Sequence, residues 1–142
     1  MDRESTLHIA AELENLAVIR RFVEKSATAL GADPAATSDV VLAADEAATN
    51  VMVHGYRGQP GTIEIEVSRM GDALVVCLRD RAAPFDPTTV PPPDLNRPLE
   101  ERSPGGMGIY LMRHLVDEVT YHATPQEGNL LTLVKRGLHE TS

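Results

Sequence analysis

The stretch DEAATNVMVHGY, from Asp45 to Tyr56, decides how this chain folds and where its chemistry lies. Within it Glu46, Asn50 and His54 recur every fourth residue, and in an α-helix such residues form one stripe with a spacing of about 6 Å. A second, apolar stripe runs beside it, as expected of a helix that packs by one face; it contains Val40, Ala44, Ala47 and Val51. The pattern predicts either a helix that lines a functional site or a solvated helix with an incidental Asn, and these residues alone leave both possibilities open.

Composition limits the class of protein. The chain has 142 residues, of which 42% are hydrophobic, and this suits a single globular domain over residues 1–142. It contains no apolar run of about 18 residues, and its acidic N-terminus is unlike a signal peptide, so we expect a cytoplasmic protein without a membrane partner. The formal charge of -8 argues against a nucleic-acid partner. Cys77 is the only cysteine, which excludes an intrachain disulfide and predicts a reduced, buried thiol.

Hydrophobic periodicity predicts helices and strands that alternate along the chain. A short strand is expected over residues 6–10, followed by a helix that stops at Gly31. The helix with the polar stripe comes next and ends near Gly55. The later elements are a half-solvated strand at 62–70, a more buried strand at 73–80, a helix from about 109, and a hairpin made of 119–123 and 129–136. Together they predict an α+β fold, a two-layer sandwich whose mostly antiparallel, mixed sheet has helices on one face.

A proline-rich segment and a glycine cluster separate the middle strands from the late helix. Residues 86–104 hold six of the ten prolines, and so long a loop in a compact domain is usually functional or disordered. The sequence GGMG, Gly105 to Gly108, follows it and leads into the late helix. Glycines at a helix start let backbone N–H groups approach a phosphate, although flexible hinges use the same residues. Neither a P-loop nor a GxGxxG motif is present.

A third feature is Asp80, which stands where the 73–80 strand leaves the sheet. A carboxylate there can accept a hydrogen bond from an exocyclic amino group such as that of adenine, with Pro84 and Phe85 as an apolar wall. A turn-forming Asp is the alternative.

The three features occur in the order found in a known family. DEAATNVMVHGY is similar to the N-box, DRAAPFDP to the first glycine box, and GGMGIYLMRHLVDEVTY to the second glycine box of the GHKL ATPases. Across nearly its whole length the chain resembles the small anti-sigma factor serine/threonine kinases of this family. The resemblance implies the histidine-kinase-like ATPase (Bergerat) fold, with residues 86–104 as the lid over ATP.

The resemblance also implies a role for each motif. ATP and Mg²⁺ are the expected ligands, with Asn50 ligating the metal and Glu46 acting as the catalytic base. Asp80 would bind adenine, with Ala82, Pro84 and Phe85 beside it. The phosphates would be held by Gly105, Gly106, Met107 and Gly108, with Thr132 near them and Arg97 or Arg102 supplying charge from the lid. Ala82 departs from the family, because it stands where a glycine is usual, and its methyl group could hinder the approach of the base. His54 is expected to cap the helix or pack against Tyr56.

Three functions remain open. The first is a protein kinase that phosphorylates a STAS-type anti-sigma factor antagonist, sequesters a sigma factor and forms a homodimer, as the resemblance implies. The second is an anti-sigma-like binding module that uses the nucleotide without phosphotransfer, which Ala82 would favour. The third is the catalytic half of a histidine kinase, which needs a dimerising helical pair. The 44 residues before Asp45 leave little room for such a pair, because a strand and a helix already occupy them.

Overall fold

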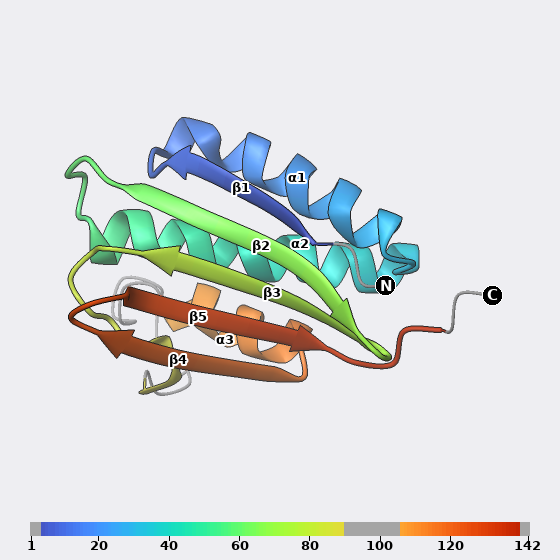
Figure 1. The fold of residues 1–142 in the computed structure, drawn as a ribbon. Coiled ribbons are helices and arrows are strands. Elements are labelled where there is room, and N and C mark those ends of the chain that lie inside the picture. Colours follow the sequence, from blue (N-terminus) through green and yellow to red (C-terminus); the bar gives the residue numbers. More distant parts are fainter. Residues whose placement is uncertain (1–3, 90–105, 140–142) are drawn as a thin grey trace.

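The protein is a two-layer sandwich with a five-stranded sheet on one side and helices on the other (Figure 1). The computed structural model describes residues 4–89 and 106–139. In spatial order the strands are β1 (Ser5–Ala10), β2 (Thr62–Met70), β3 (Ala73–Asp80), β5 (Gly128–Lys135) and β4 (Glu118–Thr124). Every neighbouring pair of these strands is antiparallel. The predicted α+β sandwich is confirmed, with a sheet that is antiparallel across its described pairs rather than mixed.

The helices lie close to their predicted positions. They are α1 (Leu16–Ala29), α2 (Pro34–Asn50) and α3 (Gly106–Leu115), with short helical turns η1 (Leu13–Asn15), η2 (Val51–Gly55) and η3 (Pro87–Thr89). Helix α2 continues into η2 as a single π-helical turn that ends at Gly55, as predicted. Helix α3 begins three residues before the predicted start at residue 109. None of the helices in the described ranges is long and apolar enough to cross a membrane.

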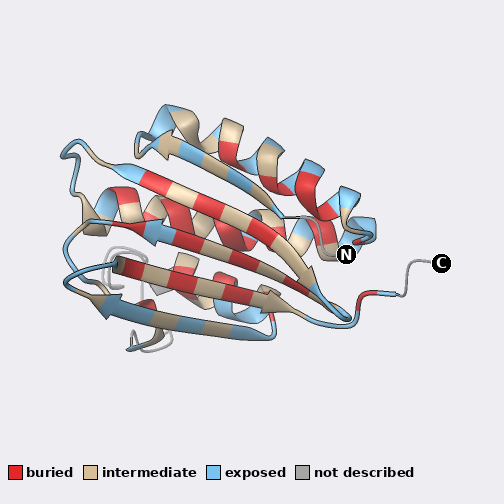
Figure 2. Cartoon of the chain, viewed as in Figure 1, coloured by how far each residue is buried: buried red, intermediate tan, exposed pale blue. Residues whose placement is uncertain are grey.

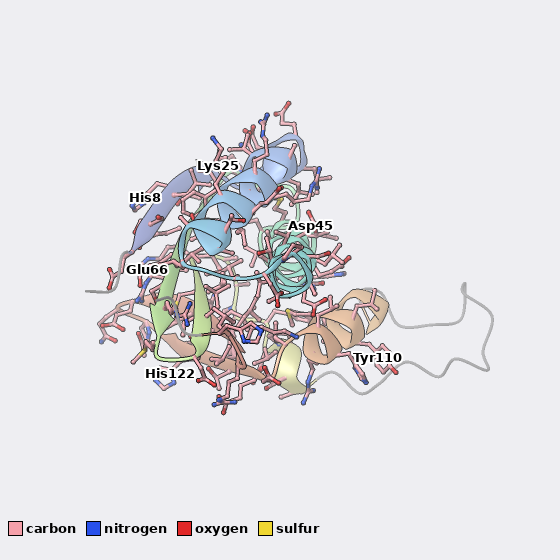
Figure 3. The ribbon with its side chains drawn as sticks, turned by 90° about the vertical axis from the view of Figure 1, so that its right-hand side faces the viewer. His8, Lys25, Asp45, Glu66, Tyr110 and His122 are labelled. Atoms are coloured by element: carbon pink, nitrogen blue, oxygen red, sulfur yellow. The ribbon has the colours of Figure 1, made fainter. Side chains whose placement is uncertain are left out.

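One face of the sheet is covered by the helices and the other is open. Along β2, β3 and β5 buried residues alternate with half-buried or exposed ones (Figure 2). Seen along the strands, His8, Glu66 and His122 lie on the open side, whereas Asp45 and Tyr110 lie on the helix side (Figure 3). Strand β3 follows the same alternation, but four of its eight residues are buried against three of nine in β2, so it is the more buried of the two, as predicted. Cys77 is only half-buried on the open face, which corrects its predicted burial.

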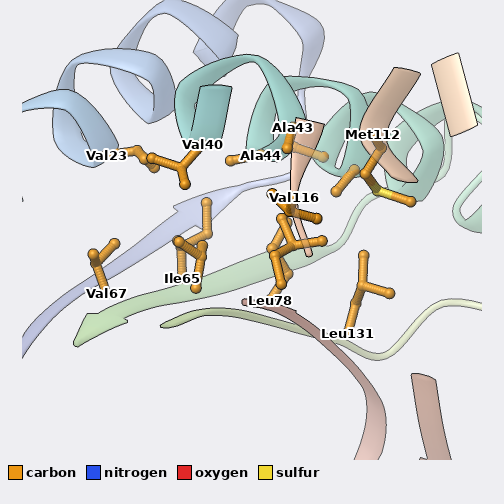
Figure 4. Close-up of a cluster of buried hydrophobic side chains, with 14 of the residues drawn as sticks. Val23, Val40, Ala43, Ala44, Ile65, Val67, Leu78, Met112, Val116 and Leu131 are labelled. Atoms are coloured by element: carbon orange, nitrogen blue, oxygen red, sulfur yellow. The ribbon is translucent and has the colours of Figure 1, made fainter. Parts of the chain in front are cut away.

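The core lies between the sheet and the helices, and α2 is its centre. Helix α2 packs against α1 on one side and α3 on the other. The close-up in Figure 4 shows side chains from all three helices meeting those of the sheet. The labelled members of this cluster are Val23, Val40, Ala43, Ala44, Ile65, Val67, Leu78, Met112, Val116 and Leu131.

Lys135 ties the end of β5 to the helices that form the site. Its Nζ lies 3.0 Å from Asp39 Oδ2 on α2. The same ammonium donates a hydrogen bond of 2.9 Å to the carbonyl of Leu115, the last residue of α3. A cation near a helix C-terminus interacts favourably with the helix dipole. One side chain therefore fixes the C-terminus of α3 relative to α2.

The start of α2 depends on a side-chain cap. Asp33 has extended backbone geometry, and its Oδ1 accepts a hydrogen bond of 2.7 Å from the backbone N–H of Ala36. Pro34 occupies the first helical turn, where its missing N–H costs nothing. The cap and the proline together set where the helix begins, and hence which residues face the sheet.

We expect Asp33→Ala to lower the free energy of unfolding by about 1 kcal/mol, because an orphan N–H of the first turn loses its acceptor. Urea denaturation followed by circular dichroism measures the change. Asp33→Asn is the matched control, because its carbonyl can still accept. Equal destabilisation by Ala and Asn would contradict the capping role.

Candidate functional site

A small recess, partly open to solvent, lies where α2, α3 and the ends of the central strands meet. Helix α2 and the turn after it contribute Asn50 and Val51, and the segment after β3 contributes Asp80 and Phe85. Further lining residues come from α3 and from the sheet; they include Met112, Tyr121, Asn129 and Leu131. The predicted site residues Asn50, Asp80 and Phe85, far apart in sequence, therefore line one recess.

Asn50 brings an unsatisfied polar group to the wall of the recess. The residue is 8% exposed, and its Nδ2 has no hydrogen-bond partner among the described residues. Buried amide groups are nearly always paired, so an orphan in the wall of a recess marks a place where a ligand can supply the missing partner. The amide can be turned to present either its N–H or its carbonyl oxygen, and the oxygen is a ligand type that Mg²⁺ accepts. Asn50 thus fits the metal–phosphate end of a bound nucleotide.

Glu46 lies one helical turn before Asn50 and contacts the first turn of α3. A Cβ atom built on Gly108 would overlap Glu46 Oε2, so only a glycine lets the carboxylate lie against this backbone. Burial raises the pKa of Glu46 from its ordinary value of 4.5, and the neighbouring Asp45 carboxylate raises it further. The structure therefore places a carboxylate with a raised pKa beside the glycine segment at the start of α3.

Asp80 is 8% exposed and lines the same recess as Asn50. Its Oδ1 accepts hydrogen bonds from the backbone N–H of Ala82 at 2.9 Å and from Asn129 Nδ2 at 2.8 Å. Asn129 Nδ2 also donates to the Ala82 carbonyl at 2.9 Å. Asn129 Oδ1 in turn accepts a hydrogen bond of 2.7 Å from the Tyr121 hydroxyl. This arrangement holds a buried carboxylate in a fixed orientation.

The apolar wall of the recess differs in part from the prediction. Phe85 stacks on His54 with ring centroids 5.6 Å apart and an interplanar angle of 29°. His54 therefore packs against Phe85 rather than Tyr56, where the sequence suggested it. Pro84 is exposed and does not line the recess, whereas the buried Pro87 does. Pro84 is therefore not part of the wall of this recess, where the sequence placed it.

Comparison with known proteins identifies the family. A model of the histidine kinase-like ATPase domain matches residues 9–135. The chain belongs to this family. Among its relatives, the serine-protein kinase RsbW of Bacillus mycoides (strain KBAB4) is 31% identical over 117 residues, which cover 80% of this chain and 73% of the relative. The serine/threonine-protein kinase BtrW of Bordetella bronchiseptica (strain ATCC BAA-588 / NCTC 13252 / RB50) is 33% identical over 104 residues, or 72% of either chain.

A solved structure supports the fold independently. The crystal structure of the RsbU and RsbW domains of a Mycobacterium tuberculosis protein matches 93% of this chain with a TM-score of 0.60 at 19% identity, and this chain spans 32% of that one. The expected resemblance to the serine/threonine kinases of the histidine kinase-like ATPase family is therefore confirmed. Family membership makes the recess the candidate ATP site.

The glycine segment and the predicted lid are described only in part. Gly106 and Met107 begin α3, and Gly108 contacts Glu46. Outside the described residues lie Gly105, the two predicted lid arginines Arg97 and Arg102, and all of the 86–104 segment after residue 89. The first residues of the segment form η3, where Asp86 Oδ1 accepts hydrogen bonds from the N–H and the hydroxyl of Thr88. The predicted phosphate role of the segment stays a prediction.

Thr132 does not reach the recess, and its predicted place near the phosphates is wrong. It pairs with Cys77 of β3 and Thr120 of β4, and its hydroxyl lies 3.8 Å from Cys77 Sγ. Its neighbours Leu131 and Leu133 are buried under the helices, and successive strand residues point to opposite faces. Thr132 therefore lies on the open face of the sheet. The residues of β4 and β5 that do line the recess are Tyr121, Asn129 and Leu131.

Asn129 and Tyr121 are the site residues that sequence reasoning missed. Asn129 lies directly opposite Asp80 in the β3–β5 register, and Tyr121 lies opposite Leu131. The signal for Asn129 was present, because it shares the face of Leu131 and Leu133 and is the polar residue nearest the strand start. Its partner could be named only once the register was known.

Ala82, the departure from the family pattern, lies against Gly55 at the end of η2. A Cβ atom built on Gly55 would lie 2.9 Å from the Cβ of Ala82. The Ala82 methyl group is therefore accommodated by the missing side chain at Gly55, and Ala82 itself does not line the recess. The two residues form a matched small pair at the junction of η2 and the segment after β3.

We expect Gly55→Ala alone to destabilise the protein by about 1–3 kcal/mol, because two methyl groups would overlap. The same change in an Ala82→Gly background should cost much less. A double-mutant cycle measured by urea denaturation isolates the coupling, since intrinsic backbone effects cancel between its arms. Additive free energies would show that the two positions do not pack against each other.

Proposed function

We propose that this protein binds Mg-ATP in the recess and transfers the γ-phosphoryl group to a serine or threonine of a STAS-type anti-sigma factor antagonist, and that it also sequesters a sigma factor. The observation that carries the proposal is the placement of Glu46 against Gly108, one turn from the orphan amide of Asn50. Asp80 lines the same recess as Asn50. These side chains supply the groups that the phosphate and purine ends of one nucleotide need.

Each residue has a chemical task in this proposal. Asp80 accepts a hydrogen bond from the amino group of adenine, beside the wall formed by Phe85. Asn50 holds the metal through its carbonyl oxygen, and the bound Mg²⁺ neutralises charge on the phosphates. Backbone N–H groups of Gly106 and Gly108, at the start of α3, face the phosphates.

Glu46 is the proposed catalytic base. An ionised carboxylate beside the phosphate end can orient the partner's hydroxyl group and take its proton during in-line attack. The raised pKa of Glu46 brings its basicity closer to that needed for such a transfer. Helix α2 supplies a rigid support, so the base does not depend on a loop for its position.

A binding module without phosphotransfer was the main alternative, and Ala82 was its motivation. The Ala82 methyl group contacts Gly55 rather than lining the recess, so it gives no steric reason for a weakened nucleotide site. This supports the kinase function over the binding module.

The partners and the oligomeric state belong to the same proposal. A sigma factor, an antagonist and a homodimer are what membership of the anti-sigma kinase group suggests. Analytical ultracentrifugation of the chain, alone and mixed with each candidate sigma factor, measures both associations.

We expect the protein to transfer label from γ-labelled ATP to its cognate antagonist, and Glu46→Gln to slow this transfer by about 10²-fold or more. Because the ionised Glu46 is poorly solvated, the glutamine variant should be at least as stable as the parent and should still bind ATP. Urea denaturation and calorimetry check these two points. ATP binding without any transfer by the parent would favour the binding module instead, and undiminished transfer by Glu46→Gln would remove the base.

The raised pKa of Glu46 gives the reaction a pH dependence. A base must be ionised, so the rate should rise with pH through a pKa above 4.5 and fall on the acid side. Single-turnover phosphotransfer measured between about pH 5 and pH 8 gives the profile. The residual activity of Glu46→Gln should lack this acid limb; if the limb persists in the variant, another group causes it.

We expect Asn50→Ala to weaken Mg-ATP binding about tenfold or more, because a buried polar ligand to the metal–phosphate group is lost. Calorimetry with Mg²⁺ and with a chelator should show the larger loss when Mg²⁺ is present. Thr49→Ala is the control on the same helix, since its hydroxyl only returns to the Asp45 carbonyl at 2.8 Å. An Asn50→Ala variant that binds Mg-ATP as tightly as the parent would disprove the metal-binding role.

A further inference from the structure

The hydrogen bonds behind Asp80 have a single consistent direction. Asn129 Nδ2 faces two acceptors, Asp80 Oδ1 at 2.8 Å and the Ala82 carbonyl at 2.9 Å, so both amide hydrogens are donated. Asn129 Oδ1 can then only accept, and the Tyr121 hydroxyl donates to it at 2.7 Å. The Tyr121 oxygen in turn accepts from the backbone N–H of Phe85 at 3.2 Å. A turned Asn129 amide would set its oxygen against two acceptors, and a turned Tyr121 hydroxyl would set its hydrogen against the N–H of Phe85, so the direction of the network is fixed.

This network leaves one oxygen of Asp80 for a ligand. Oδ1 is occupied by two donors, the N–H of Ala82 and Asn129 Nδ2. Oδ2 has no hydrogen-bond partner within residues 4–89 and 106–139, although Asp80 is 8% exposed and lines the recess. An ionised carboxylate oxygen without a partner in the protein is free to accept a hydrogen bond from a ligand. The geometry therefore presents one fixed acceptor to whatever occupies the recess.

The same network fixes the wall on which a ring would lie. Asn129 holds the Ala82 carbonyl, and Tyr121 holds the N–H of Phe85, so the segment that leaves β3 is attached to both β5 and β4. Asn129 is 5% exposed. Burial raises the pKa of Tyr121, which keeps its hydroxyl protonated and able to donate. The carboxylate and the Phe85 wall are thus oriented by the same two side chains.

We infer that Asn129 and Tyr121 are positioning residues that orient Asp80 Oδ2 toward the 6-amino group of a purine, and that they thereby set selectivity for adenine over 6-oxo purine nucleotides. An ionised carboxylate only accepts, so it pairs with an amino group and repels a carbonyl oxygen at the same position. The inference rests on the proposed function, because it takes the recess as the nucleotide site. It adds the two residues through which Asp80 acts.

The test compares ATP with inosine triphosphate, which carries a carbonyl oxygen where ATP carries the amino group. Calorimetry on the parent should show ATP binding about tenfold or more tightly. Tyr121→Phe removes only the hydroxyl, and Asn129→Ala removes the amide. Both should reduce this preference by about threefold or more, chiefly by weakening ATP. Asp80→Ala gives the preference that remains without the carboxylate.

Thr132→Ala is the matched control, because Thr132 lies on the same strand as Asn129 but on the open face. The preference of the Thr132→Ala variant for ATP over inosine triphosphate should equal that of the parent. Tyr121→Phe retains the ring, so it provides a test even if Asn129→Ala fails to fold.

The outcomes separate this inference from the function on which it rests. Equal weakening of both nucleotides, or an unchanged preference in Tyr121→Phe, would show that the two residues only support the structure and would overturn the inference. A parent that binds neither nucleotide would overturn the proposed function itself. A parent that binds ATP but does not discriminate would leave ATP binding in place and remove the role of the network.

Discussion

The close packing of α2 is the constraint on which the rest of the site depends. Four alanines of this helix are at most 1% exposed; they are Ala43, Ala44, Ala47 and Ala48. Such small side chains let the helix backbone approach the sheet and both neighbouring helices, because interaxial distance depends on the side chains at the contact. Larger residues would move α2 outward, and Glu46 and Asn50 would move with it. The packing of α2 in the core therefore sets where Glu46 and Asn50 lie relative to α3 and the sheet.

The sheet supplies the second half of the site through one turn. Gly128 has φ of 80°, and a Cβ atom on it would lie 2.5 Å from the Asp80 carbonyl oxygen. Glycine alone adopts this conformation readily and permits this approach. The turn lets β5 begin directly beside the end of β3, so that Asn129 pairs with Asp80. Polar contacts at this end of the recess thus follow from backbone geometry.

Much of the fold was predictable because its patterns are periodic. The stripe of Glu46 and Asn50, the alternation of β2 and the position of Asp80 at a strand end all follow from spacing alone. Irregular segments have no such period, which is why Pro84 was misplaced after β3. Thr132 was misplaced for another reason. The resemblance identified the correct strand, but Thr132 stands between Leu131 and Leu133, which face the helices, and successive strand residues point to opposite faces of the sheet. Contacts across the sheet, such as that of Asn129 with Asp80, depend on register, which a single strand does not reveal.

Two consecutive carboxylates of α2 illustrate why position decides role. Asp45 and Glu46 are about 100° apart on the helix, so they face different neighbours. Asp45 turns toward α1, where its Oδ1 accepts a hydrogen bond of 2.9 Å from Arg20 Nη1. Glu46 turns toward α3 and has no ion-pair partner among the described residues, while burial and the adjacent charge raise its pKa. An acid neutralised by an arginine suits helix packing, whereas an uncompensated one with raised basicity suits proton transfer. Both side chains are carboxylates, so residue type does not distinguish them. Their positions on the helix do, because Glu46 belongs to the stripe that contains Asn50 and Asp45 does not.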